Sequence, residues 1–230
     1  MRKSDESNGG DSNSIIDYYI EVLHENERFL RDNAEDTYRE VVGLINDTID
    51  YVSFTLEEKK EKAVIDPFRF FLYHVLMPQS YAVLADLLMG NLPACFMVLR
   101  LMLETMAESY LASLHSDSEV FFEGKTELLF GEKSKSKIIK EFGEEISFED
   151  KPVALWGKLS NEWIHTEGVV TRIIQKIVQE GDIPAWALVI PINYTKEDLD
   201  TLNELSAAVK KFREVLKRTM EKYSFSSDQM

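Results

Sequence analysis

The chain has 230 residues, of which 44% are hydrophobic, and this is enough to bury one large core. Its formal net charge of −15 opposes broad non-specific association with nucleic acid or anionic lipid, so an RNA-binding role would require a local basic patch. The single cysteine, Cys95, excludes an intrachain disulfide and a cysteine-based metal cage, and we expect a cytoplasmic protein.

Residues 1–14 are rich in Ser, Asp, Asn and Gly and contain no apolar run. This composition is the opposite of a signal peptide and predicts a disordered tail. We expect a single helical domain over residues 15–223 and a second short tail over residues 224–230. Apolar residues recur at steps of three and four along nearly all of the domain, so the predicted fold class is all-α, a helical bundle.

The domain is predicted to begin with two amphipathic helices, over residues 15–31 and 34–61. Each has an apolar stripe at helical spacing, and each carries many acidic residues on its other faces. We expect the apolar stripes to pack on the core and the acidic faces to lie in solvent.

Asp66 and Pro67 are typical of a helix start, and Gly90 is typical of the end of that helix. Pro78 lies inside the helix and should kink it, unless the helix begins just after this proline. A further helix starts after the short turn at Asn91, which predicts an antiparallel helix pair.

Residues 81–114 are apolar enough to raise the question of a membrane span. A span requires about 20 consecutive apolar residues, whereas this segment is interrupted by polar residues and a proline. The interruptions are Asp86, Asn91, Pro93, Arg100, Glu104 and Glu108. We therefore predict a core helix pair and no membrane segment.

Residues 118–148 are more polar and are predicted to hold one shorter helix between loops. Asp150 and Pro152 start the next helix, which is expected to stop at Gly181. The stretch 183–193 is apolar but contains two prolines, so it is predicted to cover a core edge or to form part of a subunit contact.

Thr195 and Asp198 resemble the capped start of a last amphipathic helix, which is predicted to run to residue 223. This helix carries a basic group within an acidic protein: Lys210, Lys211, Arg213, Lys217, Arg218 and Lys222. The group could contact RNA. It could equally pair with the acidic first two helices, within one chain or across a dimer.

The segment from Lys158 to His165 lies on a predicted amphipathic helix, where Asn161, Glu162 and His165 share one helical face. His165 can exchange a proton near neutral pH, and Asn161, one turn earlier, could orient it or a substrate oxygen. With Lys158 nearby, this face could hold a phosphate if it were open. The alternative is that His165 is a partly buried histidine satisfied by Glu104 or by a backbone carbonyl.

Arg100 and Glu104 form an i,i+4 pair inside the most apolar helix of the protein, where buried charges require partners. A pair of this kind is commonly a structural ion pair. The functional alternative is that one of the two side chains reaches across the bundle to His165. The polar centre would then comprise Arg100, Glu104, Asn161 and His165, and its arginine could hold a phosphate or carboxylate through two hydrogen bonds.

An apolar helix hairpin thus carries Arg100-Leu-Met-Leu-Glu104, a polar segment follows, and Leu159-Ser-Asn-Glu-Trp-Ile-His165 belongs to a later helix. This order of features resembles that of the HEPN superfamily of prokaryotic helical proteins, and the likeness is to the divergent branches of that superfamily. The resemblance covers about residues 67–180 and implies a HEPN-like four-helix core, with the first two helices and the last as additions. HEPN domains are often dimers, so the resemblance also implies a dimer. Many members are metal-independent ribonucleases of toxin, antiphage or RNA-processing systems.

The HEPN signature is an arginine, a polar residue that is often asparagine, and a histidine four or five positions beyond the arginine. Asn161 and His165 match the last two positions, but Ser160 stands where the arginine is expected. A metal-independent ribonuclease needs a cation to stabilise the charge that develops on the phosphorane, and serine supplies none. Lys158 or Arg100 could substitute in space. The resemblance therefore argues more for fold and dimerisation than for nuclease activity.

A metal site is a further hypothesis, because Glu162-Trp-Ile-His165 and Glu21-Val-Leu-His24 both have the Glu-x-x-His spacing of di-iron carboxylate bundles. Such a site also needs a carboxylate from each of two further helices, for which Glu104, Glu108 and Asp86 are candidate donors. The alternation of motif helices and single-glutamate helices that these bundles show is not reproduced here.

The sequence thus predicts an all-α bundle that acts as a homodimer and as a non-enzymatic or weakly active accessory protein, with RNA or a protein as partner and no cofactor. One alternative is a metal-independent ribonuclease of toxin or antiphage type with a degenerate motif. Another is a di-iron or di-manganese carboxylate bundle. A nuclease requires His165 in a cleft beside a cation, a scaffold requires a buried and hydrogen-bonded His165, and a metal protein requires carboxylates that converge on one ion.

Overall fold

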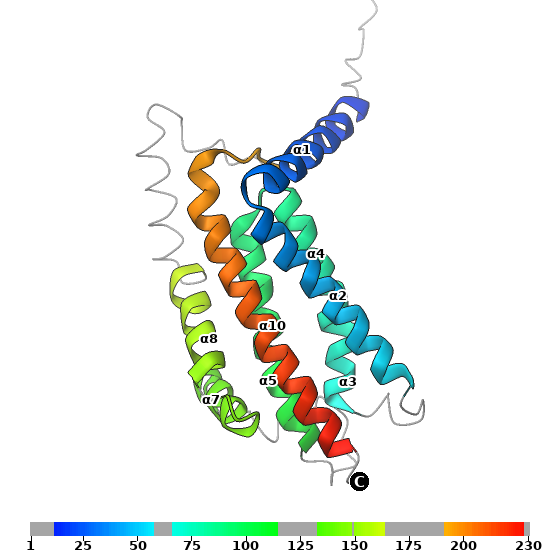
Figure 1. Ribbon diagram of the computed structural model, residues 1–230, viewed down its shortest axis with the longest axis vertical. Coiled ribbons are helices and arrows are strands. Elements are labelled where there is room, and N and C mark those ends of the chain that lie inside the picture. The colour runs from blue at the N-terminus through cyan, green and yellow to red at the C-terminus, as the bar shows by residue number, and fades with distance from the viewer. Residues whose placement is uncertain (1–11, 58–65, 115–132, 149, 164–190, 228–230) are drawn as a thin grey trace, which may run out of the picture.

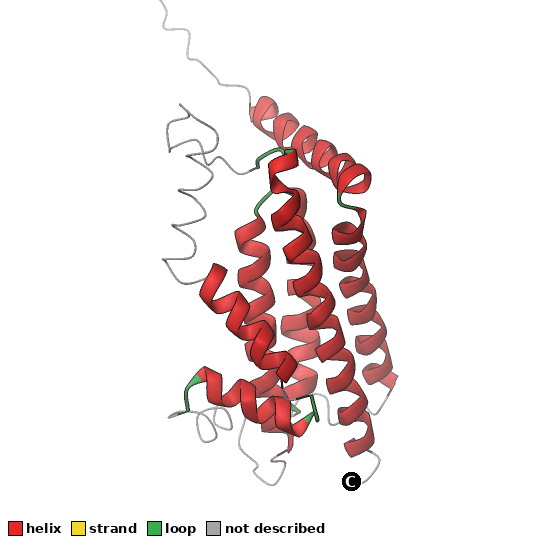
Figure 2. Cartoon of the chain, turned by 60° about the vertical axis from the view of Figure 1, so that its left-hand side comes forward, coloured by secondary structure: helices red, strands yellow, loops and turns green. Residues whose placement is uncertain are grey.

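The computed structural model describes residues 12–57, 66–114, 133–148, 150–163 and 191–227. These residues form helices and include no strand, which confirms the all-α prediction (Figure 2). Four helical elements make a central bundle (Figure 1): α2 (Glu35–Glu57), the continuous run of α3 (Pro67–Phe71), η1 (Leu72–Leu76) and α4 (Met77–Leu88), α5 (Leu92–Leu114), and α10 (Leu199–Ser227). The bundle therefore includes α2 and α10, which the sequence analysis treated as additions to a core.

The other helices pack around this bundle. α8 (Asp150–Trp163) lies along α5 and α10. α7 (Lys135–Glu145) packs against the lower end of α8 (Figure 1). α1 (Ser12–Asn33) lies across the upper end of the bundle, and its first turns extend beyond the other helices (Figure 1). The short η2 (Lys196–Asp198) precedes α10 and has the predicted capping box, in which Thr195 and Asp198 satisfy each other's backbone N–H groups. α1 begins three residues before its predicted start at residue 15. α10 ends four residues after its predicted end at residue 223.

α5 is the central helix, because it packs against α3, α4, α7, α8 and α10. Its apolar side chains are consequently buried on several sides, including the fully buried Phe96, Leu99 and Met102. This packing explains why the segment is so apolar although charged residues interrupt it. Among the described helices, none combines the length and the hydropathy that crossing a bilayer requires.

Pro78 does not break its helix. Proline lacks an N–H and its ring crowds the carbonyl four residues earlier, here that of His74. The turn before Pro78 is a π-helix over Leu72–Leu76, in which the N–H of Met77 donates to the carbonyl of Leu72, five residues back. This wider turn lets the helix continue from Pro67 to Leu88, so the predicted kink takes the form of a π turn.

A buried polar group ties together the lower ends of α3, α5 and α10, and we name its residues Asp66, Arg69, Ser113 and Tyr223 the Asp66 cluster. One carboxylate oxygen of Asp66 accepts the N–H of Phe68, as the predicted N-cap, and the hydroxyl of Ser113 at 2.6 Å. The other accepts the hydroxyl of Tyr223. The buried guanidinium of Arg69 lies 3.2 Å from that hydroxyl and 3.8 Å from Asp66. Burial and the Asp66 charge raise the pKa of Tyr223, so this phenol stays protonated.

The upper end of the bundle is closed by Asn26 of α1, which is 1% exposed. Its amide donates to the carbonyls of Leu88 at 2.8 Å and Ile192 at 2.9 Å, and its oxygen accepts the N–H of Tyr194. Gly90, with φ of +73°, ends the helix below, and a Cβ there would lie 2.3 Å from the Ile192 carbonyl oxygen. The described end of the proline-containing stretch, residues 191–193, thus lies against the edge of the bundle, and residues 183–190 lie outside the described residues.

Candidate functional site

The predicted ion pair of Arg100 and Glu104 is present on α5. Arg100 Nε donates to Glu104 Oε1 at 2.8 Å, and the two side chains are 19% and 17% exposed. The same Glu104 oxygen accepts the indole N–H of Trp156 on α8 at 2.7 Å. The guanidinium carbon of Arg100 lies 5.6 Å from the centre of the Trp156 ring. The three side chains therefore form one polar contact between α5 and α8, which we name the Glu104 contact.

The hydrogen bond of Trp156 to Glu104 was not predicted from the sequence. A usable signal existed, because a partly buried tryptophan needs an acceptor for its N–H and α5 holds few acceptors other than Glu104. A half-buried ion pair with one added hydrogen bond contributes about 1 kcal/mol to stability. The arrangement of the described side chains is thus that of a structural ion pair, in which each group already has a partner.

The polar residues of the α8 motif do not all point the same way. Ser160 is 1% exposed and lies between two contacts of α8 with α5, because Trp156 meets Glu104 and Trp163 stacks on Phe96 at 3.8 Å. Its hydroxyl has no hydrogen-bond partner among the described residues. The position at which the HEPN signature has its arginine therefore faces the core.

Asn161, by contrast, is exposed on α8, while Lys158 and Glu162 are partly buried on the same helix. The structure therefore places Asn161 on the solvent side, and the described contacts of the Arg100–Glu104 pair are with Trp156. His165 lies outside the described residues, so its predicted contact with Glu104 and its role as a proton carrier stay predictions.

The metal hypothesis needs carboxylates and histidines that converge. Within the described residues, no group of three or more His, Cys, Asp or Glu side chains lies close enough to hold a metal ion. Glu21 and His24 are exposed on α1. Glu104, the candidate donor from α5, already accepts hydrogen bonds from Arg100 and Trp156.

The outer surface of α3, α4 and α5 differs from the other helices that the structure describes in having no Asp, Glu, Lys or Arg among its exposed residues. Between Pro67 and Leu114 the exposed residues are Phe70, His74, Pro78, Tyr81, Ala85, Pro93, Met97, Leu101 and Leu114. Those on the α3–α4 run recur every three or four positions, so they share one helical face. The bond from Cys95 Sγ to the Val83 carbonyl at 3.5 Å sets Tyr81 and Met97 at one level of the antiparallel pair.

We name six of these residues, which lie at the middle of the helix pair, the hairpin face. They are Phe70, His74, Pro78, Tyr81, Met97 and Leu101. The four large apolar ones, Phe70, Tyr81, Met97 and Leu101, are 40%, 49%, 49% and 47% exposed. In a chain in which 29% of residues are charged, a helical surface of this length without an exposed charge is unusual, and exposed apolar patches of this kind are candidate contact surfaces.

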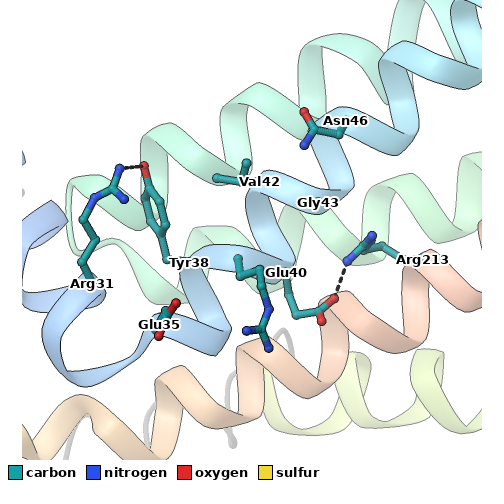
Figure 3. A pocket seen from close by; sticks show the side chains of 9 residues that line it. Arg31, Glu35, Tyr38, Glu40, Val42, Gly43, Asn46 and Arg213 are labelled. Atoms are coloured by element: carbon teal, nitrogen blue, oxygen red, sulfur yellow. Dashed lines mark hydrogen bonds and ion pairs between the residues drawn. The ribbon is translucent and has the colours of Figure 1, made fainter.

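A shallow groove of about 490 Å³ opens on the other side of the bundle, between α1, α2 and α10 (Figure 3). It contains three arginines, and each is already paired. Arg31 bonds Glu27 at 2.7 Å, Arg39 bonds Asp36, and Arg213 bonds Glu40 and Asp47 at 2.6 and 2.7 Å. Because these cations are neutralised by carboxylates in or beside the groove, it presents no concentrated positive charge to an anionic ligand.

Gly43 explains how Arg213 reaches α2. A Cβ at this position would lie 2.5 to 2.9 Å from the guanidinium atoms of Arg213, so a larger residue would require that flexible side chain to shift from its place beside Glu40 (Figure 3). The predicted pairing of the basic last helix with the acidic helices is thus confirmed for Arg213. The neighbouring Lys210 and Lys211 remain exposed.

Comparison with known proteins gives no match: no family model, no curated protein and no solved structure matches this chain. The HEPN resemblance therefore rests on residues 100–104 and 159–165 of the sequence, and the function has to be argued from the surface and contacts described above.

Proposed function

We propose that this protein is a non-enzymatic interaction protein that acts as a homodimer, with the hairpin face as the contact between its two copies. The observation that carries the proposal is the absence of charged residues among the exposed positions of α3, α4 and α5. Interfaces are depleted of charged residues at their centre and enriched in aromatic residues and methionine, which is the composition of Phe70, Tyr81 and Met97.

Charge supports a second copy as the occupant. Each chain has a formal net charge of −15, so most surfaces of two copies repel one another. The hairpin face lets two copies approach without placing like charges in contact. Its length fits a helix-on-helix contact, because Phe70 and Tyr81 are eleven residues apart, or about 16 Å along a helix.

The Glu104 contact supports the same proposal. Arg100 and Glu104 belong to the same helix as Met97 and Leu101, and their hydrogen bonds are made within the chain. A satisfied ion pair beside an apolar centre is suited to the polar rim of an interface. Since Glu104 accepts two hydrogen bonds, the described polar centre supports a structural role more than acid–base chemistry. The HEPN resemblance is consistent with a dimer, because many HEPN domains are dimers.

The test is the mass of the protein in solution, measured by light scattering on wild type, Leu101→Glu and Leu56→Glu. Leu101 lies at the hairpin face and Leu56 is 54% exposed on α2, so each variant adds one charge at an exposed leucine. We expect wild type and Leu56→Glu at twice the 26.6 kDa chain mass, and Leu101→Glu at the single mass. Monomeric wild type, or dimeric Leu101→Glu with native helicity, would refute the proposed dimer.

The non-enzymatic part has a separate test. Purified wild type and His165→Ala are incubated with structured and single-stranded RNA in EDTA, and cleavage is followed on denaturing gels. We expect no cleavage by either protein, because Ser160 is buried and supplies no cation to the reacting phosphate. Cleavage by wild type that His165→Ala abolishes would replace this proposal with a metal-independent ribonuclease.

A further inference from the structure

The first turns of α1 expose the densest group of large apolar side chains in the described part of the protein. Ile15, Ile16, Tyr18, Tyr19 and Ile20 are 62%, 57%, 47%, 39% and 48% exposed, and we name these five residues the α1 tip. They lie where α1 extends past the ends of the bundle helices (Figure 1).

The α1 tip continues the stripe that packs α1 on the bundle. Val22, Asn26 and Leu30 are at most 1% exposed and stand four residues apart along one side of the helix. The same row continues upward, at steps of three and four, through Tyr19 and Ile15, and Ile16 and Ile20 lie next to it on the adjacent side of the helix. The buried side of α1 is therefore extended by two turns into a region where its side chains are exposed. In this region the hydroxyl of Tyr18 donates to the Pro191 carbonyl at 3.5 Å, while Ile15, Ile16 and Ile20 are 62%, 57% and 48% exposed. Helical turns with little packing are marginally stable in water, so exposed isoleucines of this kind are suited to a bound partner.

The charges around the α1 tip favour one class of partner. Residues 12–27 contain Asp17, Glu21, Glu25 and Glu27 and neither lysine nor arginine. An anionic membrane surface would be repelled by these carboxylates, and a second α1 tip would double their number. A helix with its own apolar stripe and flanking lysines or arginines would bury the isoleucines and neutralise the acids.

We propose that the α1 tip is a docking site for a basic amphipathic helix of another protein. The site is separate from the hairpin face, so one dimer presents two copies of it. The apolar contacts hold the partner helix on Ile15, Ile16 and Ile20, and Asp17 and Glu21 select basic over acidic partners.

The test uses the full-length protein and two designed fluorescent peptides with one helical leucine stripe, in which the remaining positions are lysine in one peptide and glutamate in the other. Binding is measured by fluorescence anisotropy. We expect the lysine peptide to bind wild type and the glutamate peptide not to bind. The double variant Ile16→Ser, Ile20→Ser should weaken binding by about tenfold or more. The matched control Leu56→Ser, at an equally exposed leucine of α2, should change it by less than about twofold.

Charge reversal separates docking at this site from general attraction to an acidic protein. The double variant Asp17→Lys, Glu21→Lys should weaken binding of the lysine peptide by about tenfold or more. The control Glu57→Lys, Asp50→Lys on α2 makes the same change in net charge and should weaken that binding far less. Equal binding by all variants, or no binding by wild type, would overturn the proposal. So would slow thiol labelling of Ile16→Cys in the isolated protein, because the tip would then already be covered.

Discussion

The hairpin face and the α1 tip are both apolar and exposed, yet their surroundings differ. The hairpin face has no exposed charged residue around Tyr81, Met97 and Leu101, while the α1 tip is bordered by Asp17 and Glu21. Apolar exposure is the reason that we propose both as contact surfaces, and the neighbouring charges are the reason that we propose different partners for them. An uncharged face allows two acidic copies to meet, and an acid-bordered stripe favours a basic partner.

The largest predicted effect comes from giving the hairpin face a charge and then its complement. Met97→Glu and Met97→Lys should each weaken dimerisation by about a hundredfold, because two like charges meet in a desolvated contact. In a mixture of the two variants, the opposite charges should pair in a heterodimer, whose affinity should exceed that of either homodimer by about tenfold or more. Sedimentation equilibrium of each variant and of the mixture measures this, and a mixture that stays as monomeric as its components would argue against face-to-face contact.

Salt should separate the two surfaces. We expect the lysine peptide to lose about tenfold in affinity for the α1 tip when salt is raised from low to physiological concentration, since its selectivity is electrostatic. Dimerisation through the hairpin face should instead strengthen over the same range, because salt screens the repulsion between two chains of net charge −15. Anisotropy and sedimentation in the same buffers give both numbers, and a dimer that weakens with salt as the peptide complex does would remove the distinction.

A smaller effect is expected at the rim of the hairpin face. Glu104→Gln keeps an acceptor for the Trp156 indole and removes the charge that pairs with Arg100. We expect the free energy of unfolding to fall by about 1 kcal/mol, and dimerisation to weaken by no more than about fivefold. Urea unfolding followed by circular dichroism tests the first value. A decrease of more than about 3 kcal/mol in the free energy of unfolding would show that the Arg100–Glu104 pair stabilises the fold more strongly, as a fully buried ion pair does.

The smallest effect concerns Asp86, at the turn between α4 and α5. Burial raises the pKa of the Asp86 carboxyl above its ordinary value of 3.8, although the Asn91 amide donates to it. The folded state thus binds the Asp86 carboxyl proton more tightly than the unfolded state does. The stability that this proton contributes to the fold is complete below pH 3.8 and is lost as the pH rises through the raised pKa.

Asp86→Asn keeps an oxygen for Asn91 and removes the ionisation. Its Tm should exceed that of wild type by on the order of 2 °C at neutral pH, and the two values should converge in acid. Thermal unfolding over a pH series measures this difference. A variant that is less stable than wild type at neutral pH would mean that the ionised carboxylate is favourable where it stands.

Features that depend on neighbours in the chain could be predicted from the sequence. The Asp66 and Thr195 caps, the turn at Gly90 and the Arg100–Glu104 pair all follow from spacings of five residues or fewer. Their geometry is set by the local helix, so no knowledge of the rest of the fold is needed.

Contacts between distant segments could not be predicted in this way. Tyr223 meets Asp66 across 157 positions, and Arg213 reaches Asp47 across 166. Trp156 bonds Glu104 only because α8 lies along α5 at one register. The uncharged hairpin face was also missed, because burial on one side of each helix decides which of its apolar residues stay exposed.

The central claim, that a second copy covers the hairpin face, is tested most directly by thiol labelling. The natural Cys95 is fully buried and its pKa is raised well above the ordinary value by burial, so an introduced thiol is the reactive one. Leu101→Cys is labelled with a maleimide over a range of protein concentrations beside Leu56→Cys, at a similarly exposed position of α2. We expect labelling of Leu101→Cys to slow by about tenfold as the concentration rises, while Leu56→Cys keeps one rate. Equal and concentration-independent rates for both variants would contradict the dimer.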